Sequence, residues 1–163
     1  MASTVKAKTL RVTIQEELVL NGVNYGSKTK FNYTSINEIY RRVVSCAASS
    51  STTIAVFKSA VTIEDSVLDI QDVKYIRVTN LDDTTDILLN FQLDTAEDDS
   101  AAADNTTIVL GEGESFIYGS PHDSIGVDST SATIVTTLVD IESIVAKNLG
   151  SDIIDIEIFI ASA

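Results

Sequence analysis

Apolar and polar residues alternate with a period of two along most of this chain, which is the pattern of strands packed on a core by one face. The clearest internal example is 73–80, and the last segment, 152–160, alternates isoleucines with Asp155, Glu157 and Phe159. Helical periodicity competes only at 35–44, where a strand and one short helix both fit the pattern. We favour the strand there, because β-branched residues are frequent throughout the chain.

Turn residues divide the chain into roughly ten short strands at the spacing that is typical of a β-sandwich or jelly roll. The expected strands lie within 9–14, 18–20, 28–46, 54–57, 67–70, 73–80, 86–93, 106–110, 114–118, 124–127, 139–146 and 152–160. Asn21 and Gly22 form a strong turn signal. We expect 73–80 to form a hairpin with 86–93, and 140–146 to form another with 152–160.

The first 50 residues have weaker turn punctuation than the rest. We therefore divide the chain into an N-terminal segment, 1–50, which is an extended arm or an interface element, and a β-sandwich domain, 51–163. The acidic stretch 94–105 has no strand pattern, and we expect it to be an exposed loop.

Composition supports strands and adds a charge pattern. Hydrophobic residues make up 44% of the chain, with one Pro and no Trp, and the net charge is −13. Residues 1–80 carry 10 of the 11 Lys and Arg, whereas residues 81–163 carry 17 of the 24 Asp and Glu. This balance disfavours nucleic acid and anionic membranes as partners. The two halves could form faces of opposite sign that steer docking, or the acids could simply keep the loops soluble.

Groups that could perform catalysis are scarce. The single histidine, His122, lies in a loop beside Asp123 and Ser124, where adjacent residues rarely point at one another, so we interpret it as a solvated turn residue. The single cysteine, Cys46, excludes an internal disulfide and is interpreted as a small buried residue. The acids of 94–104 lack the glycine and the spacing of a calcium loop. We predict no catalytic residue, no cofactor and no metal site.

Four segments of the second half carry a resemblance to a known group of proteins. They are Val73–Asp82, Ile87–Phe91, Gly111–Ile117 and Asp140–Lys147, followed by the closing strand up to Ala161. In this order they resemble small structural proteins of tailed bacteriophages, particularly those of cyanobacterial hosts. The resemblance covers residues 73–163, and residues 1–72 lie outside it.

The resemblance implies a virion component that is assembled in the host cytoplasm and is not an enzyme. The leading hypothesis is a capsid decoration or cement protein, which would bind copies of itself and the major capsid protein. The alternatives are a tail, neck or fibre-base component, or a glycan-binding sandwich. The residues that could meet an acidic neighbour are Lys6, Lys8, Arg11, Arg41 and Arg42, and each could equally be ordinary surface charge.

Overall fold

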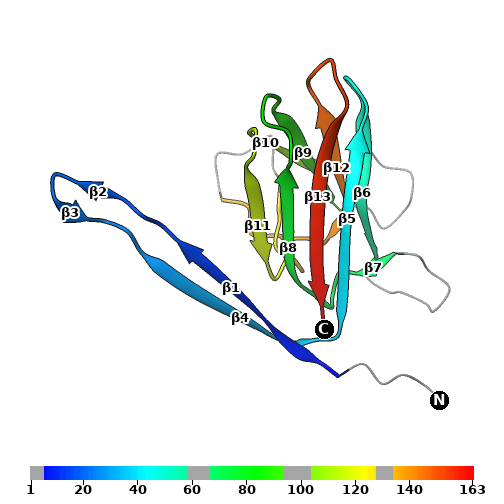
Figure 1. Cartoon of the computed structure of the whole chain (residues 1–163). Coiled ribbons are helices and arrows are strands. Elements are labelled where there is room, and N and C mark those ends of the chain that lie inside the picture. Colours follow the sequence, from blue (N-terminus) through cyan, green and yellow to red (C-terminus); the bar gives the residue numbers. More distant parts are fainter. Residues whose placement is uncertain (1–5, 59–66, 94–103, 128–133) are drawn as a thin grey trace.

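The computed structural model describes residues 6–58, 67–93, 104–127 and 134–163. Within these ranges the chain forms strands and no helix. The strands build two parts, a sandwich of two packed sheets and a long hairpin arm that projects away from it (Figure 1). The prediction of an all-β sandwich is therefore confirmed.

Nine strands form the sandwich. They are β5 (Glu38–Cys46), β6 (Ser51–Lys58), β7 (Leu68–Asp69), β8 (Val73–Asn80), β9 (Ile87–Leu93), β10 (Asn105–Leu110), β11 (Ser115–Gly119), β12 (Ile141–Asn148) and β13 (Ile154–Ser162). One sheet has the strand order β11-β8-β13-β5, and the other has the order β10-β9-β12-β6-β7. The short β7 pairs with the end of β6 in parallel, and all the other pairs are antiparallel.

The strands of the sandwich pair in a nested order, from the two ends of the domain inwards. Leaving out β7, the first strand of the sandwich pairs with the last (β5 with β13), and the second pairs with the second to last (β6 with β12). The pairs β8 with β11 and β9 with β10 continue this series inwards. Most strands that follow one another in the sequence therefore lie in opposite sheets.

This order contradicts both predicted hairpins. Strand β8 lies in the first sheet and β9 in the second, and β12 and β13 are divided in the same way. The alternation of residues was interpreted correctly, but short connections were assumed to join paired strands. In this sandwich the short connections after β8 and β12 cross from one sheet to the other.

The core lies between the two sheets and is rich in β-branched residues. Four isoleucines of β13 (Ile154, Ile156, Ile158 and Ile160) point inwards and are buried, and they pack with residues such as Leu89 of the second sheet. Cys46 is also buried, as predicted. This core cluster contains no residue of the arm, so the sandwich has a hydrophobic core of its own.

The arm is a long two-stranded ribbon made by β1 (Lys8–Gln15) and β4 (Lys28–Ile36), which is continued by β2 (Val19–Leu20) and β3 (Val23–Asn24). Asn21 and Gly22 both have positive φ angles, 50° and 79°, as a type I′ hairpin turn requires. The turn predicted there is confirmed. The segment 35–44 is strand rather than helix, with a break between β4 and β5 at Asn37.

The predicted segment 1–50 contains both the arm and β5. Strand β5 pairs with β13 over nine residues and forms the edge of the first sheet. The expected strand 124–127 is reduced to one isolated bridge between Ile125 and Val139. Most of the expected acidic loop, 94–103, lies outside the described residues.

Candidate interaction surface

The arm is amphipathic because its two strands alternate in register. Val12 of β1 lies opposite Phe31 of β4, and Leu10 lies opposite Tyr33, so these side chains share one face. Arg11 lies opposite Asn32 on the other face. Lys30 and Lys28, opposite Thr13 and Gln15, complete that basic face. The ribbon thus carries an apolar face and a basic face, back to back.

The base of the apolar face packs on the outside of the first sheet. Tyr33 contacts Tyr75 of β8 with ring centroids 5.4 Å apart, and Tyr75 contacts Phe159 of β13 with centroids 6.0 Å apart. Ile36 and Ala161 are buried in the same small cluster. Burial raises the pKa of the Tyr75 hydroxyl, although the nearby Arg77 guanidinium acts in the opposite direction. A second, smaller core therefore fixes the arm to the sandwich.

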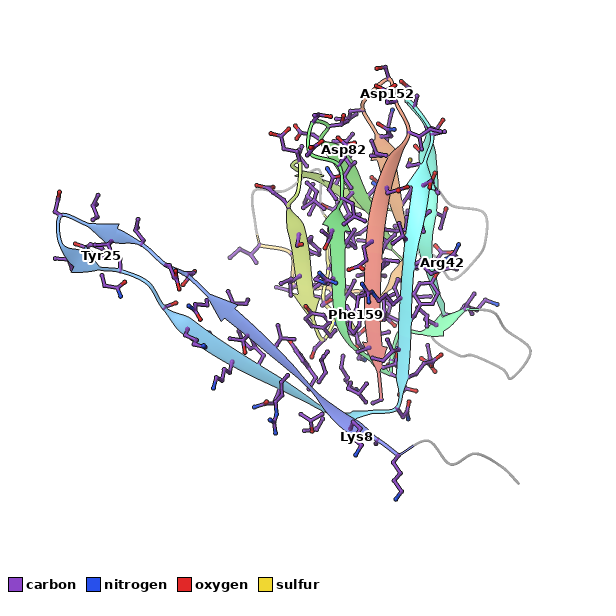
Figure 2. All side chains as sticks on the ribbon, in the orientation of Figure 1. Lys8, Tyr25, Arg42, Asp82, Asp152 and Phe159 are labelled. Atoms are coloured by element: carbon purple, nitrogen blue, oxygen red, sulfur yellow. The ribbon has the colours of Figure 1, made fainter. Side chains whose placement is uncertain are left out.

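Beyond its base, the apolar face has no cover within the described residues. Ile14 and Phe31 are 39% and 42% exposed, and five residues at the far end of the arm are more than half exposed. Those five are Leu18, Val19, Leu20, Val23 and Tyr25. Leu20 lies opposite Val23 on the apolar face, whereas Val19 lies opposite Asn24 on the other face. Figure 2 shows Tyr25 at the far end of the arm, well away from the sandwich. Apolar surface exposed to this extent marks a contact site, and a two-stranded ribbon alone is only marginally stable in water.

Of the predicted contact residues, Lys6 and Lys8 lie at the base of the arm. Lys6 and Lys8 border a shallow groove of about 330 Å³, where Leu10 and Ile36 of the arm meet Ile39 of β5. Arg11 lies further along, on the basic face. The structure thus brings Lys6 and Lys8 together beside an apolar groove.

Arg41 and Arg42 lie on the edge strand β5 and have different surroundings. Arg41 donates to the Glu157 carboxylate, with its Nη2 2.5 Å from Oε2, and Arg77 pairs with the other oxygen of the same carboxylate. The hydrogen bond from Arg41 is the main cause that lowers the pKa of Glu157, and burial acts against it. Arg42 follows the inward face of β5 and donates to the Tyr40 hydroxyl at 3.2 Å. Arg41 is thus already paired within the chain, whereas Arg42, among the described residues, bonds only to its own strand.

Sequence reasoning missed the two features that define this surface. Lys28 and Lys30 were not named among the basic contact residues, although they share a face with Arg11. The apolar run 18–20 was interpreted only as a strand of the N-terminal segment that leads into the turn, and its residues were not named as contact residues. The signal that could have revealed the exposed end of the arm is the set of apolar residues on both sides of Asn21-Gly22, namely Leu18 to Leu20 before it and Val23 and Tyr25 after it.

The outer face of the second sheet differs from the rest of the sandwich in its charge. The outward positions of β10, β9, β12 and β6 form three rows across the four strands. The rows are Val109, Leu88, Lys147 and Ser51; then Thr107, Asn90, Val145 and Thr53; then Asn105, Gln92, Ser143 and Val56. These twelve positions hold one Lys and no acid, whereas the chain after the arm (37–163) holds 22 Asp and Glu. We refer to these positions as the uncharged face.

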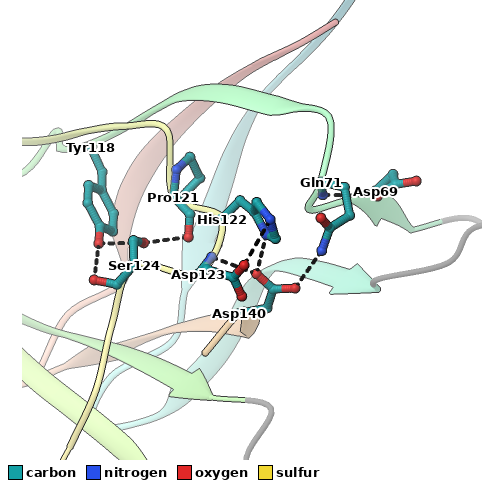
Figure 3. Close-up of polar contacts among 8 residues, drawn as sticks. All are labelled: Asp69, Gln71, Tyr118, Pro121, His122, Asp123, Ser124 and Asp140. Carbon is teal, nitrogen blue, oxygen red and sulfur yellow. Dashed lines mark hydrogen bonds and ion pairs between the residues drawn. The ribbon is translucent and has the colours of Figure 1, made fainter. Parts of the chain in front are cut away.

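A polar network closes the loop at the start of β12 (Figure 3). His122 Nδ1 lies 2.7 Å from Asp140 Oδ1, and His122 Nε2 lies 3.0 Å from Asp123 Oδ2. The Asp123 amide donates to Asp140 at 2.8 Å, and Gln71 Nε2 donates to the other Asp140 oxygen at 2.7 Å. The sequence predicted a solvated turn histidine. In the structure, His122 instead contacts two carboxylates.

His122, Asp123 and Asp140 are close enough to ligate one cation. Their oxygens and nitrogens already bond to one another, to a backbone amide and to Gln71, and these bonds explain the geometry without an ion. Nearby, Tyr118 donates to Ser124, which in turn donates to the Pro121 carbonyl. The network joins the connection after β11 to the start of β12 and to the turn after β7, which is a structural use of these side chains.

In the described ranges the chain has no helix that is long and apolar enough to span a membrane. Comparison of the sequence with models of protein families and with curated proteins finds no match, and comparison of the fold with solved structures finds none either.

Proposed function

We propose that this chain is a non-enzymatic structural protein of a virion, which works by binding other proteins through its projecting arm. The observation that carries the proposal is the amphipathic ribbon, whose apolar face is covered at the base and open over its outer half. A protein that acted alone would gain nothing from an exposed ribbon of this kind, because its apolar side chains and unpaired strand edges favour association.

The order of the strands adds support. We propose that the sandwich is a jelly roll, because its eight long strands pair first with last, second with second to last, and so on inwards. Jelly rolls are frequent in viral capsid proteins, and also in lectins. Because one fold serves many functions, the exposed arm of this chain supports the proposal more strongly than the strand order does.

The phage setting rests on the resemblance of residues 73–163 to small structural proteins of tailed bacteriophages. Within that setting we propose a decoration or cement protein on the shell, with a tail, neck or fibre-base component as the alternative. A cement protein bridges its neighbours, and an arm that reaches beyond its own domain is a means of bridging (Figure 1). The predicted contact residues Lys6, Lys8, Arg11 and Arg42 belong to this proposal.

The test is quantitative mass spectrometry of purified particles from the source of this chain. We expect the chain at a molar ratio comparable to that of the major shell protein. A copy number of only a few per particle would indicate a component of the tail or neck. Its absence from intact particles, while it is present in the infected cell, would overturn the virion assignment.

A further inference from the structure

We propose that the partner of the open arm is a second copy of this chain, and that the arm lies on the uncharged face of that copy. This inference rests on the proposed function, because it names the partner of the same arm.

Charge favours contact between the arm and a sandwich over contact between two arms. Residues 6–36 carry five Lys and Arg and two Glu, whereas residues 37–163 carry six Lys and Arg and 22 Asp and Glu. Two arms would repel each other, while an arm and a sandwich attract. A second copy is also present at the concentration of the chain itself, wherever the chain is made.

The arm cannot lie along its own sandwich in this structure. Its base is fixed to the outside of the first sheet by Tyr33, Tyr75 and Phe159, and its outer half points away from that sheet (Figures 1 and 2). The same sheet carries the ionic cluster of Glu157 on its outer side. Among the described residues, no such cover lies on the second sheet.

The uncharged face has the properties of the centre of a protein interface. Charged residues are depleted at interface centres, and here they are nearly absent from a strongly acidic body. Val109 and Val56 are 62% and 43% exposed, so the face offers apolar contact.

The polar side chains of this face already bond to one another. Asn90 Nδ2 donates to Asn105 and Thr107 at 2.9 and 2.8 Å, and Ser143 donates to Gln92 at 2.7 Å. Because these groups have partners within the face, covering them with an apolar ribbon leaves few hydrogen-bonding groups unsatisfied.

The resulting contact joins two different surfaces, so it is heterologous and builds a ring or an open chain of copies. Each copy gives its arm from the side of the first sheet and receives an arm on the second. The lysines of the arm, on its opposite face, remain within reach of acids such as Glu142, which borders the uncharged face at a bulge of β12.

The experiment is cross-linking of the full chain with a short bismaleimide, using single substitutions at exposed positions. Leu20→Cys, on the apolar face opposite Val23, reports the arm, Val109→Cys reports the uncharged face, and Ile153→Cys, between β12 and β13, is the control. The native Cys46 is fully buried and serves as an internal blank in the unsubstituted chain. None of the three substitutions touches the core, so each variant is expected to fold.

We expect a covalent dimer when Leu20→Cys and Val109→Cys are mixed, and none when Leu20→Cys is mixed with Ile153→Cys. The double change Lys28→Glu with Lys30→Glu should reduce the yield about tenfold or more, since it reverses the charge of the arm. A dimer from Leu20→Cys alone would show that arms bind arms and would overturn the proposal. A chain that stays monomeric and uncross-linked at high concentration would also overturn it, and the arm would then serve another protein.

These results are independent of the particle measurement. If the purified chain cross-links but is absent from particles, the virion assignment is wrong and the contact between the arm and the uncharged face stands. If the chain is present in particles at high copy number but its copies do not cross-link, the virion assignment stands and the proposed contact is wrong.

Discussion

The ring of Tyr33, from the arm, lies against the ring of Tyr75, on a central strand of the sandwich, with centroids 5.4 Å apart. This contact joins residues that are 42 positions apart in the sequence, and it forms the centre of the smaller core. The larger core between the sheets contains no residue of the arm. The direction of the arm and the stability of the sandwich therefore depend on different side chains.

Replacing Tyr33 with Ala should release the base of the arm and leave the sandwich folded. The loss of the aromatic contact and of part of the buried area is expected to cost about 1–3 kcal/mol in the local stability of the arm. Hydrogen exchange of the amides in β1 and β4 should accelerate on the order of tenfold or more, with the amides of β8 and β13 unchanged. Tyr25→Ala, at the exposed end of the arm, is the matched control and should have no such effect. Equal acceleration in both variants would contradict the role given to Tyr33.

The absence of a side chain at Gly119 should be necessary for the position of the Tyr33 ring against the sandwich. A Cβ added at Gly119 would lie 2.6 Å from the Tyr33 hydroxyl, closer than any real contact, so Gly119→Ala must displace that ring. We expect Gly119→Ala to accelerate exchange in the arm in the same way as Tyr33→Ala, though to a smaller extent. The double variant Gly119→Ala with Tyr33→Phe lacks the clashing hydroxyl and should recover much of the loss. If the double variant is no better than Gly119→Ala alone, the clash is not the cause.

The smaller core should open at alkaline pH. The pKa of Tyr75 in the folded protein is raised by burial, so its neutral form is favoured by folding. The sign follows: this stabilisation is complete below the unfolded pKa of about 10 and is lost as the pH rises through the higher folded value. Absorbance of tyrosinate should show one phenol that ionises later than the others, and arm exchange should accelerate over the same pH range. In Tyr75→Phe the late step should be missing, and a late step that persists would assign it to another tyrosine.

The strands of this protein could be predicted because their signal is local. The limits expected for 73–80 agree with β8, and the alternation at 152–160 correctly divides the buried isoleucines of β13 from the outward Asp155, Glu157 and Phe159. The pairing of strands is not local. The connection 81–86 is short enough for a hairpin, yet Asn80 donates from its side chain to the carbonyls of Thr85 and Gly111 and fixes a corner between the sheets. An asparagine in a turn gives no indication of which sheet the next strand joins.

The arm shows the same division between local and distant information. Asn21-Gly22 predicted the turn, and alternation in 9–14 predicted the strand. Nothing in 1–50 indicates that Tyr33 meets Tyr75, because the partner strand lies beyond the arm in the sequence. The uncharged face could not be predicted either, since its twelve positions come from four strands whose order was unknown.

Glu157→Gln should destabilise the sandwich by about 1–2 kcal/mol at neutral pH, because Arg41 and Arg77 would lose the carboxylate between them. The pKa of Glu157 is lowered in the folded protein, so its contribution is present above the unfolded pKa and is lost as the pH falls through the folded value. Urea unfolding should therefore show a difference between the variant and the natural chain at pH 7 that shrinks well below pH 4. A difference of the same size at both pH values would mean that packing, not charge, is lost.

Arg41 and Arg42 should respond differently to reversal of their charge. Arg41→Glu places a carboxylate beside Glu157 and should lower the stability of the chain, so it cannot report on binding. Arg42 donates only to Tyr40 within the described residues, and Arg42→Glu should change the stability by less than about 0.5 kcal/mol.

Arg42→Glu is therefore the informative variant for the predicted contact with an acidic partner. If Arg42 contributes to that contact, the variant should bind purified particles several-fold more weakly, and the deficit should diminish at high salt, where the charges are screened. The variant Lys74→Glu, on β8, matches the change in net charge at another position and is the control. Unchanged binding by Arg42→Glu, or an equal loss in the control, would remove Arg42 from the interface and leave its role on the edge strand. There an inward-facing charge discourages pairing with another sheet, so Arg42→Val should then promote aggregation at a concentration that the natural chain tolerates.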